Sequence, residues 1–186
     1  MIGIDAFARE LRALPSSDFT LEGVDTFLRA NPVEPSSLAP YLHYEATHYT
    51  RHLIDRCERY ELLAICWEVG QASSIHNHSG QRCWMTAPIG RLAVQNYKAL
   101  RQDEATGFCE LVETDRVDMD SAHPAFVRPE EPIHAVLNLS EFAARATSLH
   151  VYSLPYDRCL VYSKEAQTCR EIPLFFDTEY GRPARD

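Results

Sequence analysis

Residues 70–90 read GQASSIHNHSGQRCWMTAPIG, and the histidine pair within this stretch decides how the rest of the chain is interpreted. In a β-strand, the side chains of residues i and i+2 point to the same face. His76 and His78 would then project together, roughly 6.5 to 7 Å apart along the strand. That separation lets both imidazoles reach one metal ion. A single H-x-H pair also occurs on surfaces and in cores, so the pair alone leaves a structural role open.

The spacing around this pair resembles a known motif. Residues 70–90 follow the first cupin motif, G(x)5HxH(x)3–4E(x)6G, with Cys83 in place of the glutamate. Residues 129–138, PEEPIHAVLN, resemble the second cupin motif, which ends in H(x)3N, and depart from it at Glu131, where a glycine is usual. Two partial motifs in this order predict a metal-binding barrel in which His134 completes a three-histidine site.

The ligand type narrows the choice of metal. Three neutral imidazoles suit Fe(II), Zn(II), Cu(II) or Ni(II). Without a carboxylate ligand, the site would keep a net charge near +2 and open coordination positions. A thiolate suits such a site, because it is soft and coordination deprotonates it.

The pattern along the chain predicts the fold class. Apolar residues at helical spacing over 4–14 and 21–28 predict two helices, with Pro15 ending the first and Thr20 capping the second. A short third helix could begin at residues 36–37. Strands are expected over residues 61–69, 91–97, 108–119, 147–152 and 160–163. We therefore expect a mainly β fold: a cupin-type, jelly-roll-like double-sheet β-barrel with two or three N-terminal α-helices.

One domain is expected over residues 1–186. Residues 1–45 would form a helical portion packed on the barrel, and residues 46–186 the barrel with a C-terminal extension. The tail after Pro173 is expected to be extended or loosely packed.

Composition excludes several classes of partner. The formal net charge of −9 disfavours nucleic-acid binding. No apolar run approaches the roughly 20 residues that span a bilayer, and residues 1–14 lack the pattern of a signal peptide. The six cysteines include no C-x-x-C pair, which favours reduced thiols in a cytoplasm.

The chain resembles the cysteine dioxygenase family, the thiol dioxygenases of the cupin superfamily, over roughly residues 40–165. The matching stretches are Tyr49-Thr50-Arg51, Ile65-Cys66-Trp67, Ser74-Ile75-His76-Asn77-His78, Cys83, His134-x3-Asn138 and Ser148-Leu149-His150-Val151-Tyr152-Ser153. The resemblance implies non-haem Fe(II) on His76, His78 and His134. It further implies oxidation of L-cysteine to cysteine sulfinate with both atoms of O2, the substrate binding through its sulfur and amine. We expect a monomer.

Two residues are candidates for substrate binding. Arg51 offers a guanidinium fork suited to a carboxylate, and the resemblance implies this role with help from Tyr49. A surface salt bridge is the alternative for Arg51. Family enzymes that act on 3-mercaptopropionate usually carry glutamine at this position, so Arg51 favours cysteine.

Ser148, His150 and Tyr152 alternate, so they share one strand face. If that face points inward, the three polar groups need partners. The simplest network runs from Ser148 through His150 to the Tyr152 hydroxyl, near the metal. An outward polar face is the alternative that alternation alone leaves open. Trp67, on a buried strand, is interpreted as core.

The resemblance also implies a covalent feature and shows one departure. Cys83 and Tyr152 match a pair that many animal members join by a thioether cross-link, so we expect that link to form. Many members carry Ser-Pro-Pro after the tyrosine, with a non-trans peptide, whereas this chain has residues 153–155 as Ser-Leu-Pro. A cis bond before leucine costs about 3 kcal/mol, against roughly 0.5 to 1 before proline. The loop here could therefore be reshaped.

Two other classes of function remain as alternatives. One is a metal-binding cupin that is no oxygenase, such as a Zn(II) isomerase or a small-molecule sensor, because the fold alone proves no activity. The other is a structural or interaction cupin, which would not need the three histidines, Arg51 and Tyr152 together.

Overall fold

The computed structural model describes residues 1–127 and 132–184. Its helices are α1 (Ile4–Ala13), α2 (Leu21–Ala30) and the short 3-10 helices η1 (Ser16–Asp18), η2 (Pro35–Tyr41) and η3 (Ser140–Phe142). As predicted, α1 ends before Pro15, and the Thr20 hydroxyl caps α2 by accepting the Gly23 N–H at 3.1 Å. The third predicted helix is η2. In the described ranges, no helix has both the length and the apolar character needed to cross a bilayer.

The strands form two sheets. The strands are β1 (Thr50–Cys57), β2 (Tyr60–Trp67), β3 (Ile75–His76), β4 (Cys83–Ile89), β5 (Leu92–Asp103), β6 (Phe108–Met119), β7 (Ala125–Val127), β8 (Ile133–Leu137), β9 (Ala146–Ser153), β10 (Arg158–Ser163), β11 (Thr168–Pro173), β12 (Thr178–Glu179) and β13 (Arg182–Pro183). Seven strands lie in the order β13-β12-β1-β2-β9-β4-β7. The other six, β10-β11-β6-β5-β8-β3, close into a ring. The predicted mainly β, cupin-type double-sheet barrel with N-terminal helices is confirmed.

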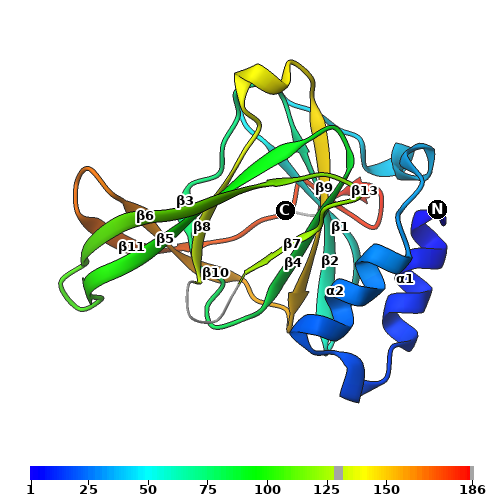
Figure 1. The fold of residues 1–186 in the computed structure, drawn as a ribbon, viewed down its shortest axis with the longest axis horizontal. Coiled ribbons are helices and arrows are strands. Elements are labelled where there is room, and N and C mark those ends of the chain that lie inside the picture. Colours follow the sequence, from blue (N-terminus) through cyan, green and yellow to red (C-terminus); the bar gives the residue numbers. More distant parts are fainter. Residues whose placement is uncertain (128–131, 185–186) are drawn as a thin grey trace.

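Strand β2 explains how the layers are held together. All eight of its residues are buried, as its nearly unbroken apolar sequence predicts for a strand covered on both faces. Leu62 and Ala64 pack outward in a cluster with α1 and α2, whereas Leu63 and Ile65 pack inward in the core of the barrel. Figure 1 shows both helices against the outer side of the sheet that contains β2 and β4. The helices therefore cover the outer face of one sheet, on the side away from the barrel interior.

A stretch without regular secondary structure links the N-terminal helices to the barrel. The predicted division after residue 45 falls between η2 and β1. The hydrophobic cluster that joins the helices to the sheet is continuous with Tyr60 and Trp84 of the barrel. The description of residues 1–186 as one domain stays a prediction.

The C-terminal tail is extended, but it is not loosely packed. Strand β12 pairs in parallel with β1, with His52 opposite Thr178, and β13 extends the same edge of the sheet. The buried His52 ring lies 2.9 Å from the Thr178 hydroxyl. These contacts fix the tail beside β1, the strand that carries Arg51.

Candidate metal centre

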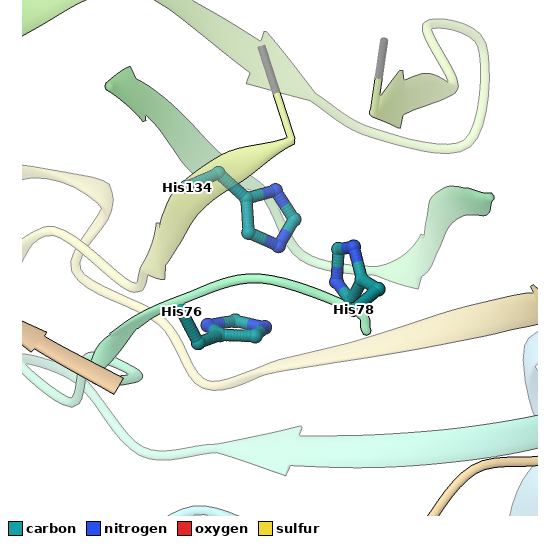
Figure 2. A group of neighbouring side chains, drawn as sticks. All are labelled: His76, His78 and His134. Atoms are coloured by element: carbon teal, nitrogen blue, oxygen red, sulfur yellow. The ribbon is translucent and has the colours of Figure 1, made fainter. Parts of the chain in front are cut away.

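Three histidine side chains converge inside the barrel (Figure 2). His76, on β3, lies directly opposite His134, on β8, in the antiparallel register. One ring nitrogen from each of His76, His78 and His134 lies within 4.8 Å of those of the other two. The ring centroids are 4.7 to 5.1 Å apart. Side chains from two separate segments therefore surround one point, as the two partial motifs predict.

His78 reaches this point differently from the prediction. Strand β3 ends at His76, so His78 is not on a strand. The chain turns immediately afterwards, where Ser79 and Gly80 both have positive φ angles. The prediction that His76 and His78 lie on the same face of one regular strand was therefore wrong. The two rings are nevertheless neighbours, with centroids 5.1 Å apart.

The protonation state of the three rings suits a metal ion. Burial lowers the pKa of His76 to about 4, and it lowers the pKa of His78 and of His134 well below the usual value. The rings are thus neutral at pH 7 and offer lone pairs. His76 Nδ1 donates to the Ser74 carbonyl at 2.9 Å, which leaves Nε2 as its free acceptor.

The ring nitrogens of the other two histidines lack partners. Among the described residues, both nitrogens of His78 and both of His134 are buried without a hydrogen bond. Buried polar atoms normally find a partner, because an unmet one costs free energy. A divalent metal that takes one nitrogen from each ring would account for this arrangement, so the residues present fit the implied ion.

A hydrogen-bond chain with a defined direction lies beside the histidines. The indole Nε1–H of Trp67 donates to the Ser148 hydroxyl oxygen at 2.9 Å, so the serine O–H is free to donate to His150 Nε2 at 2.8 Å. His150 is neutral, since burial lowers its pKa to about 3. Its Nδ1 then carries the proton and donates to the Tyr152 oxygen at 3.1 Å. In this direction the Tyr152 oxygen accepts a hydrogen bond, so its O–H can donate to another acceptor.

Cys83 is the cross-strand neighbour of Tyr152. Cys83, on β4, is directly opposite Tyr152, on β9, in the antiparallel register, and both side chains are buried. The Cys83 sulfur is 4.0 Å from His150 Nδ1. Burial raises the pKa of the Cys83 thiol well above its usual value, so the thiol holds its proton.

The candidate substrate-binding residues line a cavity that His76 also borders. Arg51 and Tyr49 both border it, and the Tyr49 ring stacks on Trp67 with centroids 4.6 Å apart. The cavity is also bordered by His76, His150, Tyr152, Tyr156, Cys159 and Leu174. Arg51 and Tyr49 thus border the same cavity as His76 and Tyr152. Among the described residues, Arg51 makes no salt bridge.

Two aromatic residues at this site had no predicted role in it. Trp67 is buried, as its interpretation as core requires, but it also borders the cavity and begins the hydrogen-bond chain. Tyr156 follows β9, and its ring lies 5.1 Å from that of Tyr152 and 6.2 Å from that of His78. No spacing rule identifies a single tyrosine in a loop, so only the fold could place Tyr156. Glu131, the departure from the second motif, lies outside the described residues.

Comparison with known proteins decides the family. The profile of the family described as Cysteine dioxygenase type I matches residues 9–165. This chain belongs to that family. The resemblance drawn from the sequence is therefore confirmed.

Relatives of this cysteine dioxygenase family member are similar over most of its length. Cysteine dioxygenase type 1 from Homo sapiens is 26% identical over 165 residues, which cover 88% of this chain and 80% of the human protein. The protein of the same name from Danio rerio is 23% identical over 167 residues, covering 89% and 81%. The structure of TT1209 from Thermus thermophilus aligns with a TM-score of 0.46 at 20% identity, over 63% of this chain and 93% of that one.

Two further features of this family member lie near Tyr152. Glu61, directly opposite Tyr152 on β2, is fully buried, and its carboxylate lies 3.7 Å from the Nε of Arg56. Burial raises the pKa of Glu61 to about 7. In the loop after β9, Leu154 has a φ of 66°, and no peptide bond in the described residues is cis. The loop thus contains a leucine in the left-handed region, and whether its shape differs from that of relatives stays a prediction.

Proposed function

We propose that this protein is an Fe(II)-dependent cysteine dioxygenase that adds both atoms of O2 to the thiol of L-cysteine and forms cysteine sulfinate. The convergence of three neutral imidazoles without a carboxylate, beside a cavity bordered by Arg51, carries the proposal. Family membership supports the same chemistry.

His76, His78 and His134 would hold the ion. Ferrous iron, when bound, supplies the one-electron chemistry that allows O2 to react with a thiolate. The protein excludes bulk water from two of these ligands, because His78 and His134 are almost completely buried. The neutral state of the rings means that no proton must leave them before a metal binds.

Arg51 would orient the substrate. Its guanidinium is free of carboxylate partners in the described residues and faces the cavity. A bidentate ion pair with the carboxylate of L-cysteine would place the thiol toward the histidines. Tyr49, stacked on Trp67, gives the same wall a rigid surface and a phenol.

Tyr152 would hold a proton in the cavity. The chain from Trp67 through Ser148 to His150 orients the imidazole, so His150 donates to the tyrosine oxygen. The phenol O–H is then available to an oxygen atom of a bound ligand. Burial keeps the pKa of Tyr152 well above its usual value, so it acts as a donor rather than as a phenolate.

We further propose that Cys83 and Tyr152 become joined by a thioether bond. Their direct opposition on β4 and β9 supports this. The new bond joins the sulfur to a ring carbon next to the hydroxyl carbon. The thiol hydrogen and one ring hydrogen leave as two protons and two electrons, and O2 is the electron acceptor. The link would fix the phenol in one orientation.

Two alternatives are separated by one experiment. A thiol dioxygenase acting on 3-mercaptopropionate shares the metal centre but is disfavoured by Arg51. A metal-binding cupin without oxygenase activity shares only the fold. The protein should be loaded anaerobically with iron and its metal content measured. Products should then be identified with L-cysteine, cysteamine and 3-mercaptopropionate in parallel.

Each outcome of that experiment is informative. Cysteine sulfinate formed with uptake of O2 supports the proposal. A faster reaction with 3-mercaptopropionate favours the related enzyme, and bound metal without O2 uptake favours the other class. Arg51→Ala should raise KM for cysteine strongly while keeping iron. An equal loss with cysteamine, which has no carboxylate, contradicts the role of Arg51.

The remaining expectations are carried as part of the proposal. The enzyme would act as a monomer in the cytoplasm, with L-cysteine and O2 as its partners and without nucleic acid or membrane. All six cysteines are free, which suits a reducing compartment. Light scattering of the purified protein measures the oligomeric state directly.

A further inference from the structure

The C-terminal segment (residues 174–180) forms hydrogen bonds with the backbone of Arg51. The Arg51 N–H donates to the Asp177 carboxylate at 2.7 Å, and the Asp177 N–H donates to the Arg51 carbonyl at 2.8 Å. After Asp177, strand β12 of the same segment runs parallel to β1. The Tyr180 N–H donates to the Leu53 carbonyl at 2.7 Å. The segment is therefore fixed to β1 both at Arg51 and beyond it.

The same segment also contacts the guanidinium. Arg51 Nη1 donates to the Phe175 carbonyl at 3.1 Å. The Phe176 ring lies against the group, with its centroid 5.4 Å from Arg51 Cζ. One guanidinium nitrogen thus donates to a neutral carbonyl, and one face lies against a ring, which fixes the plane of the fork. Among the described residues, the other N–H groups of this guanidinium make no hydrogen bond.

The arrangement keeps the positive charge of Arg51 available. The Asp177 carboxylate accepts the Arg51 backbone N–H, and its other oxygen lies 3.8 Å from His48 Nε2. In the described part of the chain, no carboxylate lies within 4.0 Å of the guanidinium. The side chain is held by contacts that orient it without neutralising it.

We infer that Phe176 and Asp177 are positioning residues for Arg51, and that through it they set the preference of the cavity for thiols that carry a carboxylate. The inference rests on the proposed function for the identity of the ligand. Removal of the ring or of the carboxylate frees the guanidinium to rotate. The cost falls on ligands that use the fork, because a thiol without a carboxylate does not contact it.

Binding measured without turnover tests this inference. Dissociation constants of L-cysteine and cysteamine should be measured anaerobically by calorimetry on the iron-loaded protein. For Phe176→Leu and Asp177→Ala, we expect L-cysteine to bind about threefold to tenfold more weakly, while cysteamine is unaffected. Asp177→Asn keeps an oxygen that can accept the Arg51 N–H, so it should restore most of the affinity for L-cysteine.

A matched control is available elsewhere in the barrel. Phe108→Leu removes a ring whose centroid lies 5.1 Å from Arg101 Cζ, a contact like that of Phe176, and neither Phe108 nor Arg101 borders the cavity. It should leave both dissociation constants unchanged. Iron content and circular dichroism of every variant show whether the centre and the fold are retained.

The possible results decide between a positioning role and a structural one. Equal weakening of both ligands, unchanged binding of L-cysteine, or a wild-type protein that does not prefer L-cysteine to cysteamine would each overturn the inference. A wild-type protein that shows the expected binding pattern but forms no sulfinate rejects the proposed function and leaves the positioning role standing.

Discussion

His76 and His134 are directly opposite each other on β3 and β8, with their ring centroids 4.7 Å apart, although they lie in widely separated parts of the sequence. The register of one short antiparallel pair therefore brings the two halves of the metal centre together. A shift of that register by one residue would turn one ring to the opposite face of the sheet.

Replacement of His134 should abolish metal binding. His134→Ala removes one of three ligands from a site that has no carboxylate to take its place. We expect well under one iron per chain after anaerobic loading, measured by plasma mass spectrometry. His123→Ala is the control, because that side chain is 73% exposed and lies outside the cluster. Full iron occupancy of His134→Ala would show that the ion binds elsewhere.

Loss of the Ser148 hydroxyl should slow the reaction without loss of iron. In Ser148→Ala, His150 Nε2 stays buried but loses its donor, so the ring is free to carry its proton on the wrong nitrogen. We expect kcat to fall by roughly tenfold. Ser140→Ala, at an exposed serine in η3, should have no effect. An unchanged kcat for Ser148→Ala would show that the hydrogen bonds from Trp67 through Ser148 to His150 do not contribute to the reaction.

The thioether bond should be visible by mass spectrometry. After repeated turnover, the peptides that contain Cys83 and Tyr152 should appear as one joined species, lighter by two hydrogen atoms than their sum. The peptide with Cys66, a buried thiol that is not opposite a tyrosine, should remain unjoined. Two separate, unmodified peptides after many turnovers would reject the link.

Glu61 should reduce stability at high pH. Its pKa in the folded protein is raised to about 7, so the folded state retains a proton that the unfolded chain releases above its ordinary pKa. Stability is therefore lost as pH rises from roughly 4.5 to 7. Glu61→Gln should raise the free energy of unfolding by about 1 to 3 kcal/mol at about pH 8 and by much less at about pH 5.

Urea denaturation at both pH values measures this difference. Comparison with the wild type at each pH cancels the opposite contribution of the buried histidines, whose lowered pKa values favour the folded state as pH rises. Glu58→Gln, at an exposed position, is the control. An equal gain at both pH values would mean that the effect does not come from ionisation of Glu61.

Leu154 should be replaceable by glycine with a gain in stability. Its φ of 66° places a branched residue in the left-handed region, and its side chain is 52% exposed, so little apolar burial would be lost. We expect Leu154→Gly to raise the free energy of unfolding by about 0.5 to 1 kcal/mol. Leu154→Ala retains a Cβ and should give no such gain. A loss of stability in the glycine variant contradicts the prediction.

Long and regular patterns were predictable from the sequence. The unbroken apolar run of β2 indicates a strand covered on both faces, and the alternation of Ser148, His150 and Tyr152 places them on one face of β9. These inferences succeed because each pattern extends over a whole strand, so that many residues indicate the same arrangement.

Short elements were less predictable. His78 follows a strand of only two residues, and β12 also has only two, so neither carries a period that a sequence could reveal. The position of the C-terminal segment beside Arg51 depends on pairing between distant parts of the chain. Tyr156 enters the site because of where its loop turns, and the positive φ of Leu154 helps to set that turn.

The two sheets divide the chemical groups between them. His76 and His134 belong to the closed sheet, while Arg51 and Tyr152 belong to the seven-stranded one. The thickness of the hydrophobic layer between the sheets therefore sets how far the guanidinium and the phenol stand from the imidazoles. Residues such as Leu63 and Val94 fill that layer and do not border the cavity, so their packing maintains this spacing.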